Sequence, residues 1–254
     1  MIARFTQLIT IAALTAISGG EAQNIPKGFV VPKCTISPDG RYGVTVPVLD
    51  QHEDSENPKN SVVELKSGKT VAAIKTRWAG WNRMGHGGVL PCRWSPDGSL
   101  LLWEVDGKWF RDAVVLLKFK NGVSEWQCDM TAITHREILE RTKHAAPDKY
   151  AKAKNANAGN GSAYPEGFTI EVVASDPISF PMNVRAALTS DPKRIEGHPR
   201  VGSELSAIMD EDGKFAVTAF HLNDDAYEQL EEATQRPEVC PRDYDAEEKA
   251  RVGK

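Results

Sequence analysis

The chain has 254 residues, of which 41% are hydrophobic and 26% charged, an ordinary globular composition that excludes a fibrous or wholly disordered protein. Its formal net charge is -4 and its Lys and Arg residues form no cluster, so we expect neither nucleic acid nor an anionic membrane surface as a partner. We expect a single β-rich domain over residues 23–236 and a charged tail over residues 237–254.

The N-terminus has the pattern of a secretory signal peptide. Arg4 precedes an apolar run over residues 8–17, and the small residues Gly20 and Ala22 follow it. The run is about half as long as a membrane-spanning helix requires, which argues against an anchor. We therefore expect residues 1–22 to be removed after Ala22. The mature chain would then be exported, periplasmic or extracellular, without a membrane span.

The first repeat unit combines strand patterns with a defined turn. Residues 25–33, which contain Phe29-Val30-Val31, predict a strand before the turn Ser37-Pro38-Asp39-Gly40, and residues 41–48 predict its return partner. Proline presets φ at the second turn position, aspartate suits the third, and glycine takes the left-handed conformation that closes the loop. Residues 61–65 and 70–75 predict a second hairpin, which gives four strands.

The connector over residues 76–90 carries Trp78, Trp81 and His86. Two interpretations stay open for the tryptophans, which either fill the core between repeat units or form an exposed ligand platform. His86 has no His or Cys partner at a metal-ligand spacing, so it is a weak ligand-binding candidate, and we expect no metal.

The second unit repeats the turn as Ser95-Pro96-Asp97-Gly98. Residues 99–105 follow it with an apolar run dense enough for a fully buried strand. Asn121-Gly122 then separates two further strands over residues 113–120 and 123–128, and this dipeptide is the strongest short hairpin signal.

A helical insertion over about residues 134–156 interrupts the strands. Thr134 and Glu137 form a capping-box pattern that predicts a helix as far as His144, and Pro147 predicts the start of another helix. A third hairpin and a helix capped by Asn223 follow. The later strands are expected at residues 168–174, 183–188, 204–209 and 214–222.

The turn glycines define an internal repeat. Gly98 lies 58 residues after Gly40, and Gly213, in the degenerate turn Asp210-Glu211-Asp212-Gly213, lies 115 residues after Gly98, close to two periods. These units resemble the blade repeats of TolB-type and WD-repeat-like β-propellers. The resemblance implies a mainly β fold of antiparallel, blade-like four-stranded units, either an incomplete propeller or a two-sheet arrangement, with the helical insertion and a C-terminal helix. An ordinary β-sandwich with three similar hairpins is the alternative.

Four cysteines, Cys34, Cys92, Cys128 and Cys240, lie in the exported chain. An even number in an oxidising compartment favours disulfides over metal binding, and free buried thiols are the alternative. Cys34 and Cys92 each stand six residues before a turn glycine, so the repeat places them side by side. We therefore expect Cys34 to pair with Cys92 and Cys128 with Cys240.

The chain lacks the sequence motifs of common catalytic and cofactor sites, among them the Gly-x-Ser-x-Gly elbow, the His-Glu-x-x-His zinc helix and the phosphate-binding loop. The acids of Asp210-Glu211-Asp212-Gly213 do not complete a calcium loop, because Ala219 stands where such a loop needs glutamate. We expect no cofactor.

Two functional hypotheses remain. The first is an exported, non-catalytic binding or scaffold protein with an unidentified protein or small ligand. The second is a secreted hydrolase whose active site lies on loops over residues 80–88 and 189–202, which carry His86 and His198.

Overall fold

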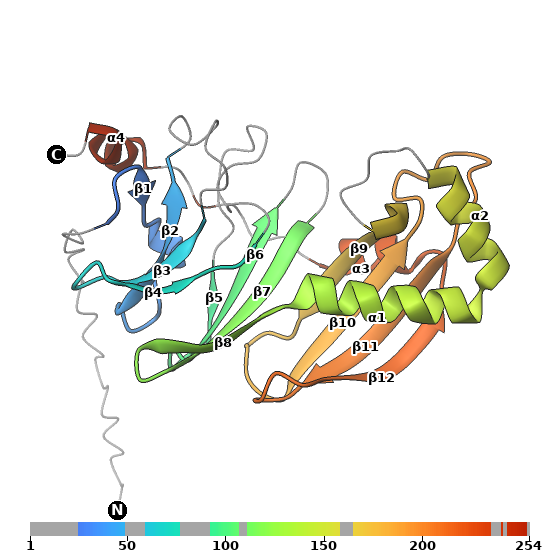
Figure 1. Ribbon diagram of the computed structural model, residues 1–254, viewed down its shortest axis with the longest axis horizontal. Coiled ribbons are helices and arrows are strands. Elements are labelled where there is room, and N and C mark those ends of the chain that lie inside the picture. Colours follow the sequence, from blue (N-terminus) through green and yellow to red (C-terminus); the bar gives the residue numbers. More distant parts are fainter. Residues whose placement is uncertain are drawn as a thin grey trace, which may run out of the picture.

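The computed structural model describes residues 25–48, 59–76, 92–106, 111–157, 165–234, 240 and 243–252. Within them, three four-stranded antiparallel sheets follow one another along the longest axis of the molecule (Figure 1). Each sheet pairs its strands in the order in which they occur along the chain. The prediction of a mainly β fold built from blade-like four-stranded units is therefore confirmed.

The first sheet contains β1 (Phe29–Val30), β2 (Tyr42–Pro47), β3 (Ser61–Glu64) and β4 (Thr70–Ala73). The second contains β5 (Arg93–Trp94), β6 (Leu100–Asp106), β7 (Arg111–Lys120) and β8 (Val123–Asp129). The third contains β9 (Thr169–Ala174), β10 (Met182–Thr189), β11 (Gly202–Met209) and β12 (Phe215–Leu222). The α-helices are α1 (Met130–Ala145), α2 (Pro147–Asn157), α3 (Ala226–Ala233) and α4 (Tyr244–Val252), and short 3-10 turns span Lys33–Thr35 and Pro165–Gly167.

The repeated turns share one backbone geometry. Gly40, Gly98 and Gly213 have φ values of 70°, 69° and 78°, and the N–H of each donates to the carbonyl three residues earlier. A Cβ added to Gly98 would lie 3.4 Å from Oδ2 of Asp39, so the first two turns are neighbours in space. The repeated turn sequence therefore corresponds to a repeated turn geometry in the structure.

The second sheet is the central layer of the stack. Along β6, Leu101, Trp103 and Val105 pack against the first sheet, whereas Leu100 and Leu102 pack against α1 and the third sheet. Alternate residues of a strand point to opposite faces, and both faces are buried here. This arrangement confirms the prediction of a fully buried strand after the second turn.

The helical insertion begins earlier than the sequence predicted. Asp129 is the N-cap of α1, and its Oδ1 accepts a hydrogen bond of 2.9 Å from the N–H of Ala132. Thr134 lies inside the helix and donates its hydroxyl to the carbonyl of Met130 at 2.6 Å. The predicted start at Thr134 is therefore wrong, whereas the predicted second helix begins at Pro147 as α2.

Two helices cover opposite faces of the third sheet. In β10, Ala186 and Leu188 belong to the cluster that contains α1, whereas Ala187 packs with Tyr227 and Leu230 of α3. Figure 1 shows α1 crossing β10, β11 and β12. The sequence predicted the helix that forms α3. It predicted Asn223 as the N-cap residue, whereas the N-cap is Asp225.

The C-terminal part of the chain returns to the first sheet. Cys240 forms a disulfide with Cys34, 206 residues away in sequence, across a Cα–Cα distance of 6.1 Å. The carbonyl of Ala250 in α4 accepts a hydrogen bond of 3.3 Å from the N–H of Gly28, and α4 lies beside β1 (Figure 1).

The predicted pairings of Cys34 with Cys92 and of Cys128 with Cys240 are wrong. Cys92 and Cys128 are free thiols. The repeat does place Cys92 beside Cys34, because the N–H of Cys92 donates to the carbonyl of Cys34 at 3.2 Å. However, Cys34 bonds instead to a residue of the returning C-terminal segment, which the local repeat could not reveal.

Candidate functional site

The structure describes only part of the predicted site. Trp78, Trp81 and His86 lie outside the described residues, as does the loop over residues 80–88. The other predicted loop, between β10 and β11, is described throughout. Each residue of this loop therefore has a described position.

Hydrogen bonds across its base hold this loop closed. The N–H of Ser190 donates to the carbonyl of Val201 at 3.0 Å, and the N–H of Val201 donates to the hydroxyl of Ser190 at 3.0 Å. The Ser190 hydroxyl also lies 3.4 Å from the carbonyl of Pro199, to which it donates. The Ser190 hydroxyl thus makes both of these hydrogen bonds to the loop backbone.

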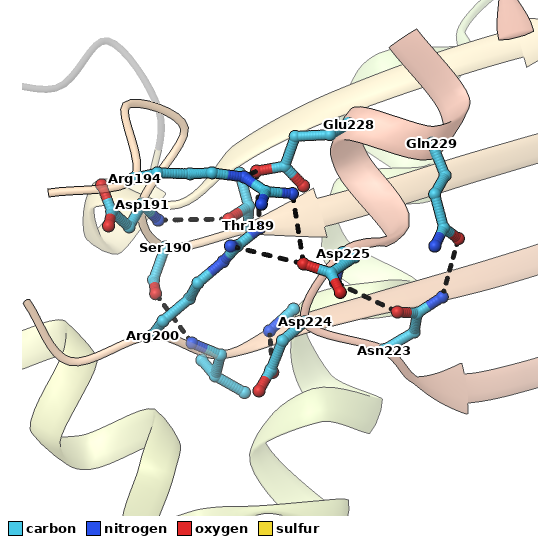
Figure 2. Close-up of polar contacts among 12 residues, drawn as sticks. Thr189, Ser190, Asp191, Arg194, Arg200, Asn223, Asp224, Asp225, Glu228 and Gln229 are labelled. Carbon is cyan, nitrogen blue, oxygen red and sulfur yellow. Dashed lines mark hydrogen bonds and ion pairs between the residues drawn. The ribbon is translucent and has the colours of Figure 1, made fainter. Parts of the chain in front are cut away.

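Asp191 shapes the next part of the loop. Its Oδ2 accepts a hydrogen bond of 2.8 Å from the N–H of Ile195, and its carbonyl accepts one of 3.3 Å from the N–H of Arg194. Arg194 has a φ of 51°, a left-handed conformation that few non-glycine residues adopt. The tight turn directs the Arg194 side chain toward α3 (Figure 2).

Two arginines of the loop meet two carboxylates at the start of α3 (Figure 2). Oε1 of Glu228 accepts from Nε of Arg194 at 3.0 Å and from a terminal nitrogen of Arg200 at 2.5 Å. Oδ1 of Asp225 lies 3.2 Å from Arg194 and 3.5 Å from Arg200. The charge and hydrogen bond of Glu228 raise the pKa of Arg194 above its ordinary value. The four formal charges cancel.

The turn between β12 and α3 completes the network. Oδ1 of Asp224 accepts from the N–H of Gly202 at 3.0 Å, and its Oδ2 pairs with Lys149 of α2 at 3.2 Å. A Cβ on Gly202 would lie 2.6 Å from the carbonyl oxygen of Asn223, so the close approach requires glycine. The network thus fastens α2, α3 and the loop to one end of the third sheet.

His198 makes no side-chain contact with the ion pairs that join the described loop to α3. Its Nδ1 is buried and makes no hydrogen bond among the described residues. Over those same residues, no group of three His, Cys, Asp or Glu side chains could hold a metal ion. The two arginines and the two carboxylates at the start of α3 neutralise one another and position this helix.

A second candidate surface is the free edge of β12. This strand pairs with β11 on one side and with no described strand on the other, and it lies at the outer edge of the third sheet (Figure 1). No charged residue interrupts Phe215-Ala216-Val217-Thr218-Ala219-Phe220. Phe215, Val217 and Phe220 remain only partly buried against the core. Such an edge presents backbone donors and acceptors to another strand.

Sequence reasoning identified neither of these two features. Arg194 and Glu228 lie 34 residues apart and form no motif. The sequence predicted the strand over residues 214–222, but strand patterns do not show which strand ends a sheet. The apolar, charge-free run was the available signal for an unprotected edge.

No family model, curated protein or solved structure matches the chain. Within the part that the structure describes, no helix is long and apolar enough to cross a membrane. The functional argument therefore rests on the free edge of β12.

Proposed function

We propose that this chain is an exported binding or scaffold protein that offers the edge of its third sheet to a protein partner. The free edge of β12 carries this proposal. A partner strand added to that edge would gain backbone hydrogen bonds, and the partly buried Phe215 and Phe220 would supply apolar contacts. The stacked four-stranded sheets would serve as the rigid support.

Two observations support the part of the proposal that concerns export. The pattern over residues 1–22 is that of a signal peptide, and the Cys34–Cys240 disulfide suits an oxidising compartment. Mass spectrometry of the protein from its native host should find a chain that begins at or near Gln23. Intact Met1 in the cytosolic fraction would contradict export.

Site-specific photo-crosslinking in the native host tests the binding surface. A benzoylphenylalanine at the exposed position Ala216 should give a covalent protein adduct, and peptide mapping should locate the crosslink in an extended segment of the partner. The same probe at the exposed position Lys152 of α2 is the control and should give no such adduct. Equal yields at both positions, or no adduct at Ala216, would rule the surface out.

A further inference from the structure

The amino-acid sequence along the free edge of β12 is almost the same in both directions. Phe215-Ala216-Val217-Thr218-Ala219-Phe220 has phenylalanine at both ends, alanine next to each end, and two β-branched residues of similar size at its centre. An antiparallel strand is read in the opposite direction, so this sequence is complementary to itself. We infer that the partner of β12 is a second copy of this chain, an inference that rests on the proposed function.

A twofold axis between Val217 and Thr218 describes the pairing. It sets Phe215 opposite Phe220 of the second copy, Ala216 opposite Ala219 of the second copy, and Val217 opposite Thr218 of the second copy. Antiparallel strands accept such a symmetric arrangement, because each copy contributes the same surface. The two third sheets would then join into one continuous sheet.

A β-bulge makes the faces of the outer pairs agree and places the unpaired Thr218 beside the axis. Within the sheet, Phe215 pairs with Met209 and Phe220 with Leu205, and both partners are buried in the cluster that contains α1. In a regular strand, residues five apart would point to opposite faces. The shift between Ser206 and Ala207 leaves Thr218 unpaired and returns Phe220 to the face of Phe215.

The outer side chains along the junction fit this pairing. Each Phe215 would pack beside Phe220 of the second copy on the α1 face and extend the apolar cluster across the junction. Ala216 and Ala219 pair with Ile208 and Ser206, so they share the other face. Their small side chains leave room for the two copies to approach.

The other described edges are short, charged or covered by a side chain, whereas the interruption in β12 is a β-bulge. At β4, the side-chain amide of Gln127 donates to the carbonyl of Ala73 at 3.1 Å and accepts from the N–H of Lys75 at 2.9 Å. β1 and β5 are two residues long, and β8 and β9 contain Glu125 and Glu171. β12 has eight residues, and its first six carry no charge.

Analytical ultracentrifugation of the full mature chain over a range of concentrations tests the inference. The wild type should sediment with twice the mass of one chain. Thr218→Lys brings two positive charges together at the axis and should give a monomer, while Thr218 is exposed and unpaired, so the fold should persist. Val123→Lys, at a side chain that is 57% exposed in β8, is the matched control and should remain dimeric.

A mixture of two oppositely charged variants distinguishes loss of the dimer interface from loss of the fold. An equimolar mixture of Thr218→Lys and Thr218→Asp chains should recover the dimer that Thr218→Lys alone has lost. A monomeric wild type, or a dimer that Thr218→Lys leaves intact, would overturn the inference. The proposed function fails separately, when crosslinking from Ala216 yields no partner, and an adduct to a different protein would support that function while overturning self-pairing.

Discussion

Gly98 holds a conformation that other residues adopt only under strain. Its φ is 69°, and an added Cβ would lie 3.4 Å from the carboxylate of Asp39 in the neighbouring turn. Gly98→Val should therefore lower the free energy of unfolding by about 1 to 3 kcal/mol. Urea denaturation of both proteins measures this loss, which is a large part of a typical stability of about 5 to 15 kcal/mol.

Gly197 provides the control for this prediction. It has a φ of 75° but no atom within 4 Å of an added Cβ, so Gly197→Val introduces backbone strain without a close contact. Because the 3.4 Å contact at Gly98 is an ordinary van der Waals distance, the two substitutions should cost similar amounts. A cost at Gly197 well below about 1 kcal/mol would contradict an origin in backbone strain.

Burial makes His135 sensitive to acid. Desolvation lowers its pKa, although its Nε2 lies 3.2 Å from the carbonyl of Phe168, a contact that acts in the opposite direction. The unfolded chain therefore binds this proton more readily than the folded one. The contribution of His135 to stability is complete above a pH of about 6.5, the ordinary pKa of histidine, and is lost as pH falls below it.

His135→Gln isolates this contribution. Urea midpoints of the wild type should fall between pH 7.5 and pH 5.5, and the variant should show a weaker fall over the same range. Glutamine can still donate a hydrogen bond to the Phe168 carbonyl but does not titrate. An identical dependence on pH in both proteins would assign the effect to other groups.

At the scale of elements, α1 depends on its N-cap residue, Asp129. Asp129→Ala removes the acceptor for the Ala132 N–H and should cost about 1 kcal/mol in the free energy of unfolding. Asp129→Ser keeps a capping oxygen and should retain most of that stability. Chemical denaturation of the two variants provides the comparison, and equal losses would indicate that side-chain capping does not stabilise α1.

At the scale of the whole molecule, the Cys34–Cys240 disulfide joins distant parts of the chain. Replacing both cysteines by serine should reduce stability by about 2 to 5 kcal/mol, because the unfolded chain loses a closure over 206 residues. Hydrogen exchange should also become faster at Gly28, whose N–H bonds to Ala250 of α4.

The two free cysteines supply the control for the disulfide. Burial raises the pKa of Cys92 well above its ordinary value and that of Cys128 to about 11. Both thiols should therefore react slowly with alkylating reagents near neutral pH and readily after unfolding. Cys92→Ser with Cys128→Ser should leave the 34–240 crosslink in place in peptide maps. A peptide map of the wild type that links Cys34 to Cys92 would contradict the Cys34–Cys240 pairing.

The sequence allowed the four-stranded units to be predicted because their determinants are local. The turn ending at Gly98 and the apolar residues after it lie within one short window, and the same pattern recurs at Gly40. The start of α1 was missed because Asp129 ends β8 directly before the helix, while Thr134 and Glu137 match a capping box one turn later.

The long-range contacts could not be predicted in the same way. Cys240 reaches Cys34 only because the C-terminal segment crosses back to the first sheet, and no short pattern encodes that path. The pairing of Arg194 and Arg200 with Glu228 likewise depends on where α3 packs. Tertiary packing, rather than local preference, decides both.

The return of α4 to β1 has a consequence for biosynthesis. A ribosome synthesises the strands of the first sheet long before it adds Cys240, which is buried in the cluster between the first and second sheets. The core beside the first sheet therefore stays incomplete until the segment that contains Cys240 has been synthesised. Premature termination at any codon before Cys240 would leave the first sheet, and not only the missing end, incompletely formed.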